Sequence, residues 1–358
     1  MSNLSRFQST RRGLLRALVV APVWPALSAL SRTAVAQSAT PIGARKLHSF
    51  SLKVSDVARS LDFYQGLFGC PIQARHGDTV LLRIGAGPYF FSLTPTGPGE
   101  APGITSIGIS VPDFDLDRVQ GQLVAHGISP ATTSDAGGLA LANRSWVRSR
   151  GPEQGGSGTR ELFFADRDGL VYQLSDPAYC GGSGPLGNSC EAVEPSSREA
   201  RLQLLELSHF TNRVHNSTVA NSYHRALFGL EFQASQGPGA PVIGVGDGIQ
   251  FLMYIGGAGE GEPTRPGVID HVCLSVADFD VERILAVLTE YGLTARSDPA
   301  NTPPLVHYIS LRMPNRGGAE GGTPELYFSD PDGIRIQLQD PGYCGGTGYL
   351  GDDCSAPV

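Results

Sequence analysis

The stretch SLKVSDVARSLDFYQGLFG, residues 51–69, contains the pattern that decides the fold. Its first residues alternate between apolar and polar, which predicts a strand. After a short polar turn, apolar residues fall three and four apart up to a glycine, which predicts a helix and its end. The same layout recurs in GISVPDFDLDRVQGQLVAHG (108–127), FTNRVHNSTVANSYHRALFG (210–229) and CLSVADFDVERILAVLTEYG (273–292). Each helix is followed by alternating runs that predict three more strands, so the chain is expected to be an α+β protein of four βαβββ modules.

The four modules group into two longer repeats, residues 45–190 and 204–354, which we expect to form two domains. The segment EAVEPSSREA links them. Each repeat ends in a glycine-rich tail, YCGGSGPLGNSC or YCGGTGYLGDDC, whose two cysteines lie ten residues apart. This spacing is too wide for a zinc knuckle and favours two local disulfides, Cys180–Cys190 and Cys344–Cys354. The apolar surroundings of Cys70 and Cys273 predict buried free thiols.

Residues 1–36 have the layout of an export signal. A basic segment with the pair Arg11-Arg12 precedes an apolar run and the small residues Ala34-Val35-Ala36. The paired arginines resemble the signal of the twin-arginine route, which predicts a periplasmic protein. Two arginines can also occur by chance in a basic segment. No later apolar run reaches the length of a membrane helix, so we expect no membrane-spanning part.

The charge balance excludes two classes of partner. Residues 1–36 contain five arginines and no acidic residue, so their removal leaves 22 basic against 34 acidic residues, a net charge of −12. An acidic chain of this kind is a poor match for nucleic acid or for an anionic membrane surface. A small-molecule partner is therefore expected.

Three motifs carry a resemblance to a known family. They are the V-S-D, S-L-D-F-Y and L-F-G elements within 54–69, and the hairpins FADRDGLVYQL (164–174) and FSDPDGIRIQL (328–338). With the fourfold module, they resemble the vicinal oxygen chelate superfamily, which includes glyoxalases, extradiol ring-cleaving dioxygenases and bleomycin-resistance proteins. The resemblance implies two domains of cupped mixed sheet, each an incomplete barrel whose concave face can hold a divalent metal. The family also contains metal-free binding proteins.

The resemblance places two metal ligands on the first strands of paired modules. Counting back seven residues from the turn aspartates gives Ser106 in the first repeat and His271 in the second, and aligning the two L-F-G elements sets Ser49 against His209. A lone strand histidine is usually structural. Two histidines at equivalent positions favour a shared metal ion, and they occur only in the second repeat.

The third ligand is the main departure from the family pattern. The family carries glutamate four residues after the hairpin glycine, where this chain has Gln337. A carboxamide oxygen can bind a metal, but its neutrality leaves the site one negative charge short. The first repeat has Gln173 at the equivalent position, so Gln337 is either a ligand or an ordinary strand residue.

Two further residues suggest a reaction. Aligning the repeats at their ends sets Tyr327 against Phe163 and His307 against Asn143. Extradiol dioxygenases keep their active site in the second pair of modules. The resemblance therefore implies Tyr327 as a hydrogen-bond donor and His307 as an acid/base, although His307 can equally be a strand residue. It also implies Fe(II), or else Mn(II) or Zn(II), and a small catechol-like aromatic with O2 as substrates.

Two alternatives stay open. The first is a metal-free binding protein of the bleomycin-resistance type, which Gln337 favours and His209, His271 and Tyr327 disfavour. The second is a glyoxalase- or lyase-type metalloenzyme. Such enzymes usually take a further carboxylate from the strand at 248–257, where the sequence GIQFLMYIGG has none.

Overall fold

Residues 39–131, 138–259 and 262–355 are described by the structure, a computed structural model. The predicted export signal at 1–36 lies outside these residues. These described residues form one compact unit. No helix among the described residues is long and apolar enough to cross a membrane.

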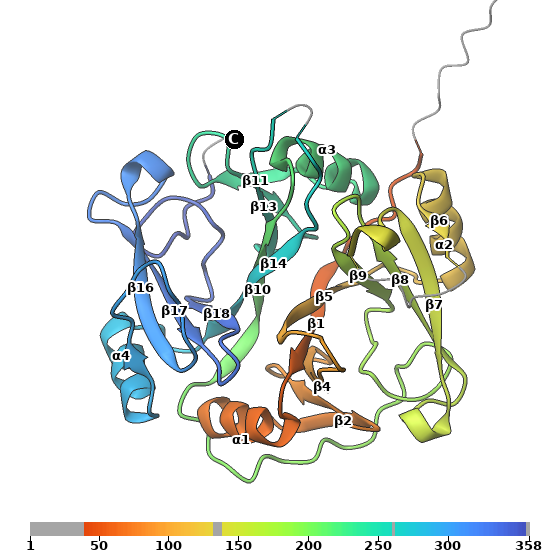
Figure 1. The fold of residues 1–358 in the computed structure, drawn as a ribbon, viewed down its shortest axis with the longest axis horizontal. Helices are drawn as coiled ribbons and strands as arrows, with labels where there is room; N and C mark the ends of the chain where they lie inside the picture. The colour runs from red at the N-terminus through yellow and green to blue at the C-terminus, as the bar shows by residue number, and fades with distance from the viewer. Residues whose placement is uncertain (1–38, 132–137, 260–261, 356–358) are drawn as a thin grey trace, which may run out of the picture. The chain divides into compact units, whose positions relative to one another are not determined.

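Two nine-stranded mixed sheets dominate this unit, and each is made from one repeat (Figure 1). In spatial order the first sheet consists of β2 (Ile72–His76), β3 (Thr79–Arg83), β4 (Phe90–Pro95), β1 (Lys46–Val54), β5 (Gly103–Ser110), β9 (Val171–Ser175), β8 (Thr159–Ala165), β7 (Arg144–Arg150) and β6 (Ser129–Pro130). The second consists of β11 (Phe232–Ser235), β12 (Pro241–Gly244), β13 (Phe251–Ile255), β10 (Leu204–Arg213), β14 (Val268–Val276), β18 (Arg335–Gln339), β17 (Thr323–Ser329), β16 (Val306–Arg312) and β15 (Thr294–Ala295). The matching strand orders confirm the predicted α+β architecture of four βαβββ modules. The two-residue strands β6 and β15 are additions to it.

Each module contributes one helix: α1 (Val57–Phe68), α2 (Leu116–Ala125), α3 (Ser217–Phe228) or α4 (Val281–Glu290). All four begin at a residue whose side chain accepts a hydrogen bond from a backbone N–H of the first turn; these residues are Asp56, Asp115, Asn216 and Asp280. Gly69 and Gly229 end α1 and α3 in the left-handed conformation, as the sequence predicts. Three short 3-10 helices complete the list: Gly138–Leu141, Pro152–Gln154 and Pro314–Arg316.

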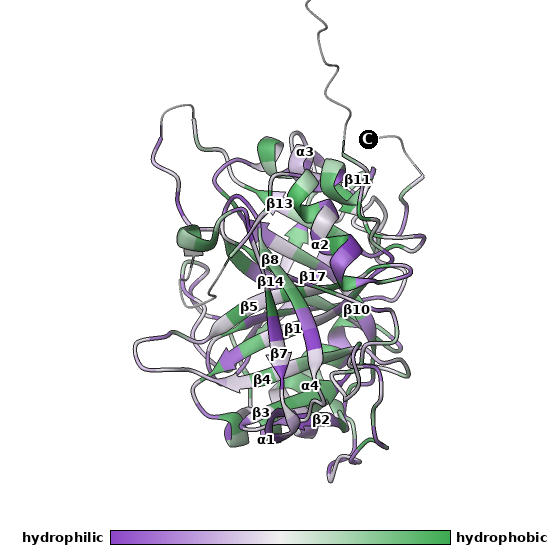
Figure 2. Ribbon diagram, turned by 90° about the vertical axis from the view of Figure 1, so that its right-hand side faces the viewer, coloured by the Kyte–Doolittle hydropathy of each residue, from purple (hydrophilic) through white to green (hydrophobic). Residues whose placement is uncertain are grey.

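The two sheets share one hydrophobic core. A single cluster of buried apolar side chains draws on both repeats, and Phe50 of β1 contacts Phe210 of β10 edge to face. Hydrophobic and hydrophilic residues succeed one another along the strands (Figure 2), since one face of a sheet packs into the core while the other lines a concave surface.

Helices α1 and α3 each reach across to the other repeat. Tyr64 of α1 donates a hydrogen bond to Asp330, which follows β17. In the reverse direction, His224 of α3 lies 3.0 Å from Asp166, which follows β8. Both aspartates also cap their own hairpins by accepting backbone N–H groups. These buried polar contacts tie each repeat to the hairpin of the other.

The glycine-rich tails are closed by the predicted disulfides. Cys180 pairs with Cys190 and Cys344 with Cys354, with Cα atoms 6.2 and 6.3 Å apart. Cys70 and Cys273 are free and buried, also as predicted. In the chain-entropy description, closing a loop of ten residues contributes about 2–3 kcal/mol to stability, so each tail is pinned against its sheet.

Candidate metal centre on the second sheet

One row of residues crosses the second sheet at the level of the predicted ligands. The strand register places them side by side in the order Phe251, His209, Cys273, Gln337, Tyr327 and Tyr308. Directly opposed residues on neighbouring strands point to the same face, so these six side chains share one face. His271 lies two residues before Cys273 on β14 and points to that face as well.

The two predicted histidine ligands are brought together. The ring centroids of His209 and His271 lie 5.7 Å apart with the planes nearly perpendicular. A ring that binds a metal through nitrogen at about 2.1 Å has its centroid about 3.2 Å from the ion, so two rings sharing an ion can lie at most about 6.5 Å apart. The observed separation therefore suits a common ion.

His271 is oriented by a carboxylate. Its Nδ1 donates to Oδ2 of Asp270 over 2.8 Å, which leaves Nε2 as the acceptor nitrogen. Arg213 and Arg335 also donate to Asp270, at 2.6 and 2.8 Å. Burial alone would raise the pKa of Asp270, but the hydrogen bond from His271, the charge of Arg335 and the hydrogen bond from Arg213 hold it well below its usual range. Asp270 is therefore ionised, and it fixes the orientation and tautomer of the His271 ring.

His209 is kept neutral by its surroundings. It is 2 % exposed, its ring stacks on Phe251 with centroids 4.2 Å apart, and its Nδ1 lies 3.2 Å from the hydroxyl of Ser208. Burial and the neighbouring His271 lower its pKa well below the usual range, while the side chain of Gln337 acts in the opposite direction. A neutral imidazole is the form that binds a metal.

Gln337 is the candidate third donor, and it carries no charge. Its side chain is 1 % exposed, and its amide nitrogen has no hydrogen-bond partner among the described residues. No group of three or more His, Cys, Asp or Glu side chains suited to a metal occurs within the described part of the chain. Two imidazoles and a carboxamide fit a divalent ion, but more weakly than a set that includes a carboxylate.

Tyr327 lies beside the histidines. Its ring meets His271 edge to face with centroids 5.2 Å apart and stacks on Tyr308 with centroids 5.1 Å apart. Its hydroxyl donates to Glu325 over 3.3 Å. Burial and the nearby Glu325 raise the pKa of Tyr327 well above its usual range, so the hydroxyl keeps its proton and remains a donor.

His307 is not brought to this face. It pairs with Phe328, a residue of the shared core, and its Nε2 lies 3.0 Å from the hydroxyl of Thr289 on α4, the helix that covers β16 (Figure 1). Its counterpart in the first sheet is Ser145, which pairs with Phe164, and not Asn143 as the sequence alignment assumed. The loop between β16 and β17, residues 313–322, is two residues longer than the loop at 151–158, and this shifts the register.

The equivalent row of the first sheet has Gln173 in the place of Gln337 but no histidine. It runs Phe90, Ser49, Gly108, Gln173, Phe163 and Trp146, with Ser106 two residues before Gly108. Serine hydroxyls are poor ligands for a divalent ion. The first sheet does contain a histidine, His48, immediately before Ser49. Its Nε2 is hydrogen-bonded to the carbonyl oxygen of Tyr179.

Four residues on or beside the site face of the second sheet were not predicted from the sequence as site residues: Asp270, Cys273, Tyr308 and Glu325. Strand alternation predicts that Asp270 points away from the site, so only its position next to His271 could have indicated it. Tyr308 was missed because of the register shift that misplaced His307.

Comparison with known proteins confirms the fold. No protein-family model and no curated protein sequence matches this chain. Among solved structures, homoprotocatechuate 2,3-dioxygenase from Brevibacterium fuscum, in complex with 3,4-dihydroxyphenylacetate, is similar with a TM-score of 0.54 at 16% identity over 86% of each chain. A Mn(II)-bound glyoxalase from Novosphingobium aromaticivorans has a TM-score of 0.53 at 14% identity, covering 83% of this chain and 82% of its own. The 2,2',3-trihydroxybiphenyl 1,2-dioxygenase from Sphingomonas wittichii has a TM-score of 0.51 at 16% identity, covering 86% and 91%.

Proposed function

We propose, starting from the vicinal oxygen chelate fold of this chain, that it is a metal-dependent enzyme that opens the ring of a small catechol-like aromatic with O2, in the extradiol manner. The active site is the metal centre on the second sheet. The observation that carries the proposal is the clustering of His209, His271, Gln337 and Tyr327 on one face, where the first sheet has only serines, Gln173 and Phe163.

The reaction class is suggested by the similar structures. Two of them are dioxygenases named for dihydroxylated or trihydroxylated aromatic compounds, and one of these holds 3,4-dihydroxyphenylacetate. They share the fold at low identity, so the transfer of this activity to the present chain rests on its own site residues.

His209, His271 and the side-chain oxygen of Gln337 are the residues that would hold the ion. Fe(II) is favoured, with Mn(II) or Zn(II) as alternatives. When bound, a divalent ion supplies a positive centre that attracts two adjacent oxygens of the substrate and lowers the pKa of a substrate hydroxyl group. Asp270 fixes the tautomer of His271 for this task.

Tyr327 would act on the substrate as a hydrogen-bond donor. Its hydroxyl stays protonated and its ring is fixed between His271 and Tyr308. The single hydroxyl proton, which points to Glu325 over a long 3.3 Å, would turn to the substrate oxygen. A donor in this position can stabilise negative charge that develops on an oxygen during ring opening. We assign no catalytic role to His307, because it bonds to Thr289 on the opposite face.

A second candidate function is favoured by one observation. Gln337 is neutral and its amide nitrogen is unpartnered among the described residues, so the face also suits a metal-free protein that binds a small aromatic compound. A glyoxalase- or lyase-type reaction is the third possibility, since a Mn(II)-bound glyoxalase is among the similar structures.

We place the protein in the periplasm. The two disulfides indicate an oxidising compartment, and the pair Arg11-Arg12 suggests export by the twin-arginine route. That route carries folded proteins, so a metal could be inserted before export.

Oxygen consumption tests the proposal. After anaerobic loading with Fe(II), the protein is mixed with catechol or 3,4-dihydroxyphenylacetate in an oxygen electrode. One O2 is expected to be consumed per substrate, with a ring-opened product that contains both oxygen atoms and is heavier by about 32 mass units. Tyr327→Phe, which copies Phe163, is expected to reduce turnover at least tenfold at unchanged metal content. Protein that takes up no Fe(II) and binds these compounds without consuming O2 would support the binding-protein alternative.

A further inference from the structure

The concave face of the first sheet encloses a cavity of about 200 Å³. Its polar lining includes Ser51, Ser92, Arg148 and Gln173, and its apolar wall includes Leu81 and Phe90. Ser51 and Ser92 occupy the positions of Thr211 and Met253 in the second sheet. These smaller side chains leave the cavity of the first sheet, called here the first cup, more open. The volume lies below the range typical of drug-sized pockets and suits a molecule of about one ring.

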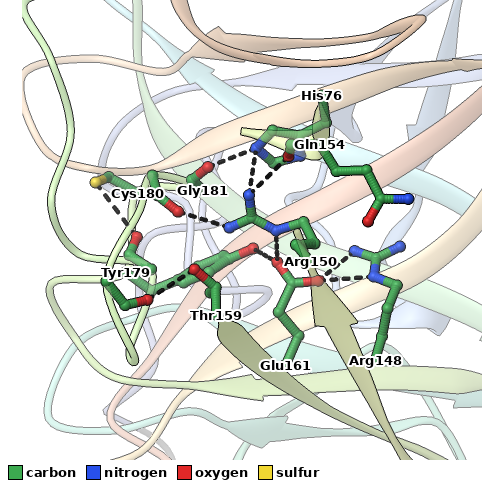
Figure 3. A network of polar contacts seen from close by, with 12 residues as sticks. His76, Arg148, Arg150, Gln154, Thr159, Glu161, Tyr179, Cys180 and Gly181 are labelled. Carbon is green, nitrogen blue, oxygen red and sulfur yellow. Dashed lines mark hydrogen bonds and ion pairs between the residues drawn. The ribbon is translucent and has the colours of Figure 1, made fainter. Parts of the chain in front are cut away.

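The cavity carries one net positive charge. Arg148 and Arg150 both contact Glu161, through Nε atoms at 2.7 and 2.6 Å (Figure 3). Burial would raise the pKa of Glu161, but the two arginines lower it, so the carboxylate is ionised. Burial and the charge of Arg150 lower the pKa of His76 to about 4, so this lining histidine is neutral near pH 7. Two cations therefore face one anion.

Arg148 contacts Glu161 through a terminal nitrogen at 2.6 Å as well as through Nε, so its second terminal nitrogen is the group that remains available to a ligand. Arg150 is buried and also donates to the carbonyl oxygens of Gln154 and Gly182. The side chain of Arg148 is 55% exposed and lies over the ring of Phe163, with its central carbon 4.9 Å from the ring centroid. In the second sheet, Arg312 and Glu325 repeat the Arg150–Glu161 pair, but the position of Arg148 is taken by Ser310. The extra charge is thus particular to the first cup.

A buried donor also lacks an acceptor in this cavity. Gln173 is 7 % exposed and lines the cavity, yet its amide nitrogen has no hydrogen-bond partner among the described residues. Buried amide groups are normally paired, because an unpaired donor loses its water without compensation. A ligand oxygen would supply the missing acceptor.

From these contacts we propose that the first cup is a second ligand site, which binds a small monoanionic compound with a carboxylate and one apolar ring. The carboxylate accepts hydrogen bonds from Arg148 and Gln173, and the ring packs against Phe90 and Leu81. The site needs no metal and is independent of the reaction proposed for the second sheet.

Benzoate is a suitable probe, with benzamide as its neutral counterpart. Trp146 lies on the same face of β7 as Arg148 and stacks on Phe163. The only other tryptophan is Trp24, in the predicted export signal. Benzoate is titrated into the chain that begins after residue 36, and binding is monitored by tryptophan fluorescence and by calorimetry. Saturable binding is expected. Binding is expected to persist after metal removal with EDTA, and benzamide should bind at least tenfold more weakly.

Variants locate the binding. Arg148→Gln and Gln173→Leu are each expected to weaken benzoate binding roughly tenfold or more, and Arg148→Lys should recover part of it. Arg160→Gln is the matched control, because Arg160 lies on β8 next to Glu161 but points to the opposite face, toward Asp117. Thermal unfolding verifies that each variant is folded. The proposal is overturned if benzoate does not bind, if benzamide binds equally well, or if His209→Ala abolishes binding while Arg148→Gln leaves it unchanged.

Discussion

At the scale of single residues, a histidine and a serine follow one another in opposite order on the first strands of the two sheets. The first sheet has His48 followed by Ser49, and the second has Ser208 followed by His209. A β-bulge shifts the strand register at this point in both sheets. His48 is consequently bound to the carbonyl oxygen of Tyr179, while His209 joins the row that faces His271. The exchange of two residues separates a structural histidine from a candidate ligand.

Gln337→Glu is the most direct test of the third ligand position. If the side chain of Gln337 binds the ion, a carboxylate should tighten metal binding by about tenfold or more, since it adds the charge that the site lacks. Competition with a fluorescent chelator measures the affinity. Gln173→Glu provides the matched control in the first sheet and should leave metal affinity unchanged. An equal effect of both substitutions, or no effect of either, would contradict a ligand role for Gln337.

The family resemblance and the comparison of the two repeats were sufficient to predict that His209, His271, Gln337 and Tyr327 share one face of the second sheet. They were insufficient for Asp270, whose carboxylate bonds to the ring of its neighbour against the expectation from alternation. The register of β10 and β14 shifts between Thr211 and Asn212, so Asp270 is the extra residue of a β-bulge, and residue types alone do not reveal such a bulge.

At the scale of elements, repeated modules made the fold predictable. Four strand–helix units with aspartate or asparagine caps give the same strand order in both sheets. The prediction failed where the two repeats differ in length. Because the loop at 313–322 contains two extra residues, the alignment placed His307 on the wrong face and overlooked Tyr308.

The contacts that α1 and α3 each make with the other repeat could not be predicted from the sequence either. Tyr64 with Asp330 and His224 with Asp166 are equivalent pairs that join residues far apart in the chain. Each member has an ordinary role in its own module, as a helix residue or a hairpin cap. Their pairing is set by the packing of the two sheets, so it becomes visible only in three dimensions.

At the scale of the whole molecule, buried histidines should make the folded chain sensitive to acid. Burial lowers the pKa of His48 to about 4, and His76 has a similar value. Both are protonated in the unfolded chain below about pH 6.5, but not in the folded one until about pH 4. Stability present above pH 6.5 is therefore lost progressively between pH 6.5 and 4, by roughly 3 kcal/mol for the fully buried His48.

Two carboxyl groups oppose this trend. Burial raises the pKa of Asp168, and it raises the pKa of Asp330 to about 6, so protonation of these groups adds stability as the pH falls toward the unfolded value near 3.8. The three buried histidines with lowered pKa values, His48, His76 and His209, outweigh these two carboxyls. Urea unfolding in EDTA should therefore show a net decrease from pH 7 to 4. His48→Asn should flatten that decrease. A free energy of unfolding that rises over this interval would contradict the assignment.

The second repeat is expected to bind a metal ion, and the first repeat is not. The most direct test is the metal content of the protein after reconstitution with Fe(II), Mn(II) or Zn(II), measured by elemental analysis. The unmutated chain and the variants Ser49→Ala and Ser106→Ala are expected to hold about one ion per chain, whereas His209→Ala and His271→Ala are expected to hold none, because each loses one of the two imidazole ligands. Absence of metal from the unmutated chain with all three ions, or retention of a full equivalent by both histidine variants, would contradict this expectation.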